Sequence, residues 1–213
     1  MLRWIGIVAA SAMLVFAALP SSASELNERV KPWDEGPQDP SFLKFRNELK
    51  DIIARKDAAA LFKLLASDIK VDFGGVYGGL EFHKKWQPFD KNSALWPALS
   101  LVVDQGGNFD SGLMFSAPYT YSAFPSDLDG MDKAVVTTEG AVMRAAPNVE
   151  AAAVRPLDHD ILTIKGTLKP QHEAGLADWA EVTDAHGTHG FVLARDVRSP
   201  LDYRAFFEKR KGK

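Results

Sequence analysis

The stretch that decides the fold is residues 179–193, WAEVTDAHGTHGFVL. Residues with high β propensity occupy 179–183 and 190–193, and Gly187 lies between the two runs. Short runs of this kind on either side of a glycine turn predict a β hairpin. The C-terminal part of the chain is therefore expected to consist of strands.

Three more short β runs precede this hairpin, at residues 134–137, 141–144 and 160–164. Five strands over roughly sixty residues predict a small barrel. Over most of residues 41–103 the apolar residues recur at helical spacing instead. The predicted fold class is α+β, with a helical N-terminal region followed by a five-stranded barrel.

Five short motifs of this region occur in a recognisable order: VMRAAP (142–147), VRPL (154–157), DILTI (160–164), WAEV (179–182) and GTHGFV (187–192). Together they resemble the bacterial SH3-like (SH3b) domain over about residues 134–198, as found in uncharacterised secreted proteobacterial proteins. Ala146 stands where that family often has a glycine, and the segment 166–178 is longer than usual. The resemblance implies a barrel that binds cell-wall peptides or partner proteins.

The N-terminus has the features of a secretory signal. Arg3 precedes an apolar stretch over residues 5–19, and the small residues Ser21 and Ala23 follow Pro20. This pattern predicts a signal peptide of residues 1–23, cleaved after Ala23, and a periplasmic or secreted protein. The alternative is an uncleaved anchor, but the apolar stretch is shorter than the roughly 20 residues of a spanning helix.

The composition excludes several classes of function. The chain has no cysteine, which rules out disulfides, thiolate metal ligands and cysteine nucleophiles. Removal of residues 1–23 deletes Arg3 and no acidic residue, so 24 Lys and Arg face 28 Asp and Glu and the net charge is −4. We therefore expect no nucleic-acid partner, no membrane span after signal cleavage and no cofactor.

Residues 24–40 are polar, contain three prolines and predict an extended leader, on which Trp33 is a candidate docking residue. A mainly helical domain is expected over residues 41–132. Its first helix is predicted to begin at the N-cap Ser41 and to end near Arg55, and Asp57 is expected to cap a second helix that completes a helical hairpin. Further helices are predicted around Leu80, Phe82 and Trp86 and, after a Ser93 cap, over Leu95, Leu99, Val102 and Val103. Trp86 and Trp96 are expected in the core.

Two segments of this domain allow a functional interpretation. Residues 69–73 alternate between apolar and polar side chains and residues 74–79 are rich in glycine, which predicts a short strand followed by tight turns. The alternative is a phosphate-binding loop, but no Gly-Lys-Ser or Gly-Lys-Thr follows the glycines, which argues against it. Residues 106–125 are dense in aromatic residues without a regular period and predict a loop-rich layer over the helices. The alternative is a ligand groove formed by Tyr119, Tyr121 and Phe124.

The barrel supplies the other candidate binding residues, Arg144, Pro147, Trp179 and Phe191. Trp179 and Phe191 occupy motif positions that are usually core, and this interpretation is favoured over ligand contact. A metal site formed by Asp184, His186 and His189 is the alternative to a solvated hairpin, and the hairpin is favoured because no distant ligand is evident.

A composition shift over residues 126–132 marks the predicted domain boundary, so the barrel is expected over 133–202, followed by a basic, frayed tail over 203–213. The leading hypothesis is a non-catalytic periplasmic binding or adaptor protein that recognises cell-wall peptide or an envelope partner. The first alternative is a cell-envelope or small-molecule enzyme with its site in the Gly74 to Pro125 region, in which Tyr119, Tyr121 and His83 would act. The second is a pure interaction module within a larger complex, without affinity for the wall.

Overall fold

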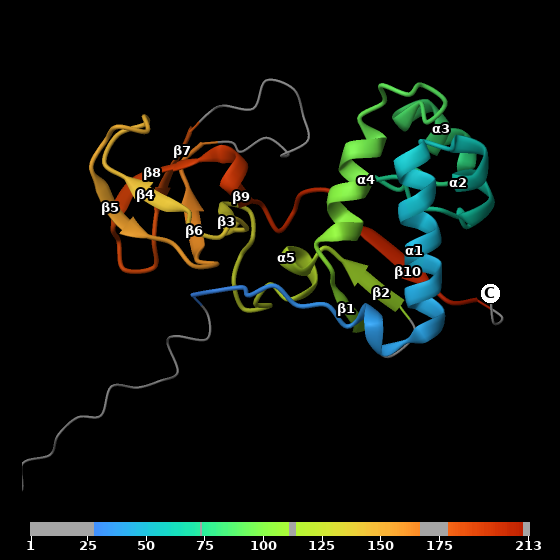
Figure 1. The fold of residues 1–213 in the computed structure, drawn as a ribbon, viewed down its shortest axis with the longest axis horizontal. Helices are drawn as coiled ribbons and strands as arrows, with labels where there is room; N and C mark the ends of the chain where they lie inside the picture. Colours follow the sequence, from blue (N-terminus) through green and yellow to red (C-terminus); the bar gives the residue numbers. More distant parts are fainter. Residues whose placement is uncertain (1–27, 73, 111–113, 167–178, 211–213) are drawn as a thin grey trace, which may run out of the picture.

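The computed structural model describes residues 28–72, 74–110, 114–166 and 179–210. It is a mixed α+β structure with two sheets. Figure 1 shows the helices and a three-stranded sheet in one lobe and a seven-stranded sheet in the other, with α5 (Tyr119–Ser122) between them. The predicted signal peptide and its cleavage point lie outside the described residues.

No helix of the described ranges is long and apolar enough to cross a membrane. The helical lobe contains four longer helices. They are α1 (Pro40–Arg55), α2 (Ala58–Leu64), α3 (Gly79–Trp86) and α4 (Leu95–Asp104). Short 3₁₀ turns lie at η2 (Gly36–Gln38) and η3 (Ala194–Asp196). The predicted positions of all four helices are confirmed.

The start of α1 differs from the prediction, because Asp39 and not Ser41 is the N-cap. Asp39 Oδ1 accepts hydrogen bonds from the backbone N–H groups of Ser41, at 2.8 Å, and Phe42, at 3.1 Å. Pro40 occupies the first helical position, where its fixed φ and missing N–H are tolerated, so the cap falls one residue before it. The Asp57 cap of α2 is as predicted, since its carboxylate accepts from the Ala60 N–H at 3.0 Å.

The helices bury their apolar faces in one shared core. Trp96 is 2% exposed, and Trp86 packs against the edge of the same core, as expected for both. The buried members of this core come from all four helices: Leu49, Ile52, Ile53, Ala58, Leu61, Phe82, Leu95, Trp96 and Val103.

Within the described residues 69–72, the strand predicted from residue 69 is not formed. A single bridge joins Lys70 to Tyr77, and Asp72 accepts hydrogen bonds from Gly74 N and Val76 N. Gly75 and Gly78 have positive φ, which favours glycine. The glycines therefore form tight turns, in agreement with the structural interpretation of this segment.

A second sheet is a feature that the sequence did not indicate. It consists of β1 (Asn108–Asp110), β2 (Met114–Ala117) and β10 (Ala205–Glu208), in the order β1-β2-β10. The expectation of a frayed tail after residue 203 is therefore wrong for 205–208. Phe207 packs in this lobe beside Phe42 and Phe45, and burial of this ring holds the strand.

The seven-stranded sheet has the order β5-β4-β8-β7-β6-β3-β9, and every pair in it is antiparallel. The five predicted strands are present, and β5 and β9 are additional. Between the edge strands β5 and β9 no pairing is formed within the described residues, so the five-stranded closed barrel is not what is seen. The bounds are β3 (Lys133–Val136), β4 (Val142–Arg144), β5 (Ala153–Pro156), β6 (Ile161–Ile164), β7 (Trp179–Thr183), β8 (His189–Leu193) and β9 (Val197–Arg198).

The sheet curls around its own core. Buried residues from β3, β4, β6, β7, β8 and β9 meet in one cluster, which contains no residue of the helical lobe. A flat sheet would need a second layer to cover its apolar face. Because this sheet curls, its own strands cover its apolar inner face, and its outer face is available for contacts with other parts of the molecule or with a ligand.

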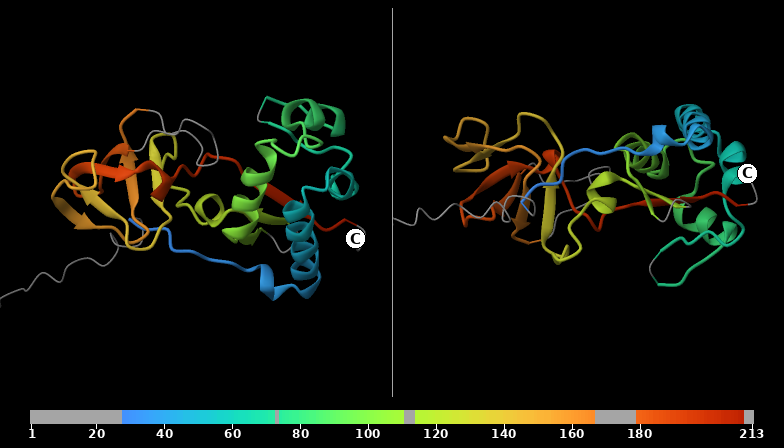
Figure 2. Two further views of the ribbon diagram at one scale, coloured as in Figure 1. Left: turned by 45° about the horizontal axis from the view of Figure 1, so that its top comes forward. Right: turned by 90° about the horizontal axis from the view of Figure 1, so that it is seen from below.

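Val30 anchors the described part of the leader, residues 28–40, to the seven-stranded sheet. Val30 is 3% exposed and shares a core with Tyr119, Val135 and Ile161. Its backbone N–H donates to the carbonyl of His159 at 2.9 Å. The views in Figure 2 show that this part of the leader runs from the seven-stranded sheet to the start of α1 in the helical lobe. Trp33, by contrast, is 54% exposed.

A buried ion pair lies where the chain leaves the seven-stranded sheet. Arg198 Nη1 is 3.0 Å from Asp202 Oδ2, and both side chains are almost fully buried. Burial lowers the pKa of the Arg198 guanidinium, and the Asp202 carboxylate opposes that change. Burial also raises the pKa of neighbouring Tyr119 to about 12, so this phenol is uncharged at neutral pH.

Replacement of Asp202 by asparagine should lower the free energy of unfolding by about 3 kcal/mol, because the Arg198 charge would stay buried without its counter-ion. Urea unfolding followed by tryptophan fluorescence measures the change. Asp51→Asn, which alters an exposed carboxylate of α1, is the control and should cost less than about 0.5 kcal/mol. Equal midpoints for the two variants would show that the pair does not stabilise the junction.

Candidate functional site

Three of the seven predicted binding residues come together on the outer face of the seven-stranded sheet. Arg144 lies on β4, Phe191 on β8 and Trp179 on β7. Glu181 and His189 share this face with them. We call these five residues the sheet-face patch.

Strand register places the patch residues in rows. Phe191 lies opposite Arg144 on one side and opposite Glu181 on the other, so these three form one row across three strands. His189 lies in the next row, and its ring meets that of Phe191 edge to face at 5.6 Å. Trp179 lies diagonal to Phe191 on the other side, because its direct partner is Leu193. Diagonal neighbours on one sheet face are within reach of aromatic side chains.

Glu181 organises the polar part of the patch. Its Oε1 accepts from Lys165 Nζ at 2.8 Å and lies 2.7 Å from His189 Nε2. The hydrogen bond from Lys165, followed by that from His189, lowers the pKa of the Glu181 carboxyl. The carboxylate is therefore ionised at neutral pH and holds the imidazole against the Phe191 ring.

Arg144 is fixed at the edge of the patch. Its Nη1 donates to the carbonyl of Ala151 at 2.9 Å, which closes the loop between β4 and β5. Pro147 lies exposed in this loop. A guanidinium carries five N–H donors, so a single bond to Ala151 leaves most of them for a ligand. Arg144 can thus present positive charge beside the aromatic rings.

The expectation that Trp179 and Phe191 are core residues is wrong. Both are half-buried on the outer face, whereas their neighbours Ala180, Val182 and Val192 fill the core. Successive residues of a strand point to opposite faces, so burial of the small residues turns the large rings outward.

Gly190 allows β8 to approach β4 closely. A Cβ atom at this position would lie 2.5 Å from the Met143 side chain and 2.8 Å from the Arg144 carbonyl oxygen. Only glycine fits such a separation. The pairing of Phe191 with Arg144 therefore depends on the residue before Phe191.

Asp184 holds the turn that joins β7 to β8. Its Oδ1 accepts from the backbone N–H groups of His186 and Thr188, and its Oδ2 accepts from Arg155 Nε at 2.8 Å. Burial opposes ionisation of this carboxyl, but the bonds from Thr188, Arg155 and His186 outweigh it and lower the pKa of Asp184. The other side of the Arg155 guanidinium binds Asp160 at 2.8 Å.

The three residues weighed as a metal site point to different partners. Asp184 is bound to Arg155, His189 to Glu181, and His186 Nε2 lies 3.5 Å from Glu28. Within the described ranges, no group of three or more His, Asp or Glu side chains is arranged to hold a metal ion. The histidines act in separate surface contacts.

The residues of the predicted aromatic groove do not form one surface. Tyr119 is 3% exposed, and Phe124 packs against the same core. Tyr121 is half-buried, meets Phe206 edge to face and has the Arg204 guanidinium over its ring at 4.3 Å. His83 of the enzyme hypothesis lies exposed on α3, where its ring neighbours Phe62 and Phe89.

Comparison of the chain with protein-family models, with curated proteins and with solved structures finds no match. Function is therefore inferred from the chemistry of the described residues.

The lowered pKa of Asp184 makes the hairpin sensitive to acid. The ionised Asp184 carboxylate stabilises the folded protein at a pH above the pKa of this carboxyl in the unfolded chain, about 3.9. This stabilisation is lost as the pH falls through the lower pKa that the carboxyl has in the folded protein. Asp184→Asn should cost about 2 kcal/mol at pH 7 and flatten the decline of stability below about pH 4. Urea midpoints between pH 7 and pH 2 measure both effects.

The matched control is Glu150→Gln, on an exposed side chain of the β4–β5 loop, which should follow the wild-type curve. If Asp184→Asn keeps the wild-type slope below pH 4, then the folded carboxyl titrates normally and the turn does not depend on its charge.

Proposed function

We propose that the protein is a non-catalytic binding or adaptor protein of the cell envelope that recognises peptide through the sheet-face patch. The observation that carries this proposal is the row formed by Arg144, Phe191 and Glu181, with Trp179 and His189 beside it. Aromatic rings next to fixed charges are typical of recognition surfaces. Signal-directed export to the periplasm is part of the proposal.

The proposal assigns residues 134–198 to the bacterial SH3-like class. Its support is the order of the five motifs and the presence of a strand at each of the five predicted positions. The curled core, to which six strands contribute, supports it as well.

The ligand we propose is a cell-wall peptide or an exposed peptide segment of an envelope protein. The Phe191 and Trp179 rings offer apolar surface, and Arg144 offers donors for a carboxylate. Glu181 and His189 together can bind an amine or a backbone group. Wall peptides combine free carboxylates with small apolar side chains, which is the chemistry that this patch complements.

Phe191→Ala should weaken binding to purified peptidoglycan by about tenfold, because a central aromatic anchor commonly contributes more than about 1.4 kcal/mol. Sedimentation of the protein with wall sacculi over a range of sacculus concentrations measures the affinity. Arg144→Gln should give a smaller loss in the same direction. Gln keeps a donor for Ala151 but removes the charge.

The control is Phe206→Ala, which removes an aromatic ring of β10 that is 48% exposed and lies on the other sheet. It should bind the wall as the wild type does. If the wild type binds neither sacculi nor an envelope protein, or if Phe191→Ala and Phe206→Ala behave alike, the patch is not the recognition surface. Recovery of a partner without wall affinity would favour the pure interaction module.

A further inference from the structure

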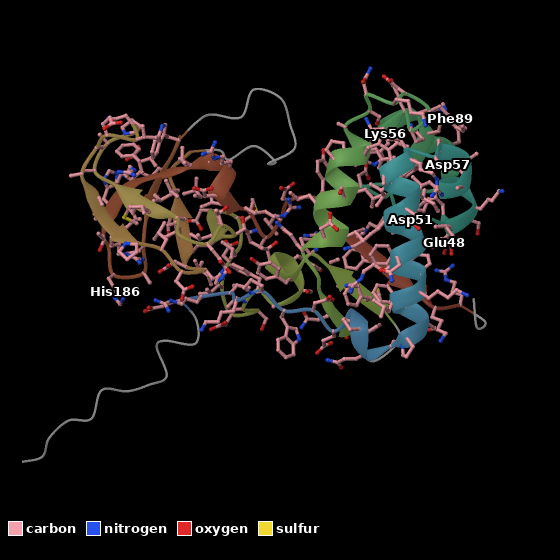
Figure 3. The ribbon with its side chains drawn as sticks, viewed as in Figure 1. Glu48, Asp51, Lys56, Asp57, Phe89 and His186 are labelled. Carbon is pink, nitrogen blue, oxygen red and sulfur yellow. The ribbon has the colours of Figure 1, made fainter. Side chains whose placement is uncertain are left out.

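A hollow on the helical lobe has a chemistry unlike that of the sheet-face patch. It has a volume of about 340 Å³ and lies between the end of α1, the start of α2 and the loop that follows α3. Its charged lining residues are Arg55, Lys56, Lys91 and Asp57, and Phe89 lines it as well. Figure 3 shows Lys56, Asp57 and Phe89 close together at one end of this lobe. A volume of this size is within the range of small-molecule sites.

Two of the cations are fixed by bonds to each other's backbone. Lys56 Nζ donates to the Lys91 carbonyl at 2.5 Å, and Lys91 Nζ donates to the carbonyls of Lys56, at 2.5 Å, and Arg55, at 3.2 Å. Each ammonium has three donors, so Lys56 retains two and Lys91 retains one. Lys91 lies here because its ammonium binds the carbonyls at the C-terminal end of α1. The same bonds hold the positive charges of Lys56 and Lys91 close together.

The third cation, Arg55, has its guanidinium available. Within the part of the chain that the structure describes, it forms no ion pair, although Asp51 lies one turn earlier on α1. The planar guanidinium matches the oxygen atoms of a phosphate in a bidentate arrangement. Arg55 is thus the residue of this hollow best suited to hold an anion.

The charges of the hollow do not balance. Three cations face the single carboxylate of Asp57, and this carboxylate already accepts the Ala60 N–H at the start of α2. The excess of two positive charges complements a phosphate monoester, whose charge at pH 7 is about −1.5 to −2.

Phe89 adds an apolar surface beside these cations. The ring is 60% exposed and is stacked on Phe62, with centroids 5.8 Å apart and planes at 19°. Stacking fixes its orientation while most of its area remains in solvent. A ligand with a flat apolar group next to its anionic group would contact both parts of the hollow.

We propose that this hollow is a second binding site, which takes a phosphate monoester attached to a ring or another apolar body. Arg55 and the free donors of Lys56 and Lys91 hold the phosphate, and Phe89 contacts the apolar body. The site is independent of the sheet-face patch, since it uses only residues of the helical lobe.

The test is an NMR titration of the chain expressed from its full-length sequence, with phenyl phosphate, inorganic phosphate and phenol as probes. Phenyl phosphate should shift the signals of Arg55, Lys91 and Phe89 and bind about tenfold more tightly than either of the other two. Arg55→Gln should weaken phenyl phosphate about tenfold. Phe89→Ala should reduce its affinity to that of inorganic phosphate.

The matched control is Lys44→Gln, which removes an exposed cation of α1 outside the hollow and should bind like the wild type. Arg55 forms no ion pair here that its replacement would break, so its variant should keep the wild-type melting temperature. Absence of binding, shifts at other residues, or equal losses for Arg55→Gln and Lys44→Gln would each overturn the proposal. If phenyl phosphate binds, sedimentation with phosphatidic acid vesicles, whose headgroup is a phosphate monoester, that is abolished by Arg55→Gln would assign the phosphate to a lipid, and absence of sedimentation would assign it to a soluble ester.

Discussion

The alternation of side chains along β7 and β8 is the constraint on which the rest of the seven-stranded sheet depends. Val182 and Val192 are fully buried, so the residues on either side of each must face outward. This brings Phe191 to the surface next to Arg144, and Gly190 lets the two strands come close enough to pair. The core and the patch are therefore two faces of the same strands, and neither can change register without the other.

Buried apolar side chains, and not only the connecting segments of the chain, hold the two lobes together. Tyr119 from α5 and Val30 from the leader pack on Val135 and Ile161 of the large sheet. The chain leaves that sheet at the same edge, where β9 pairs with β3, passes the buried Arg198 and Asp202 pair and returns to the small sheet as β10. The seven-stranded sheet is thus an insertion between two strands that pair with each other, β2 and β10, and its two ends are held at one place.

The candidate sites on the two lobes differ in chemistry. The sheet-face patch combines aromatic rings with charges of both signs, whereas the hollow beside Phe89 has an excess of positive charge. In Figure 3 Phe89 lies on the helical lobe, and His186, in the turn that joins the strands of the patch, lies at the far end of the other lobe. The two proposed sites therefore lie on different lobes, and the ligand proposed for each can be tested separately.

The sequence by itself determined the positions of the four helices, the five predicted strands and the Asp57 cap of α2, whereas the N-caps of α1 and α4 are Asp39 and Ala94 and not the predicted Ser41 and Ser93. The features that it determined depend on residues three or four positions apart or on short runs. It did not indicate the small sheet, because β2 and β10 are nearly ninety residues apart and each is too short to be recognised alone. Nor did it indicate which face of the sheet Trp179 and Phe191 take. Only the tertiary structure decided these points, since the choice of buried face and of strand partner depends on what packs against each strand and not on the strand's own residues.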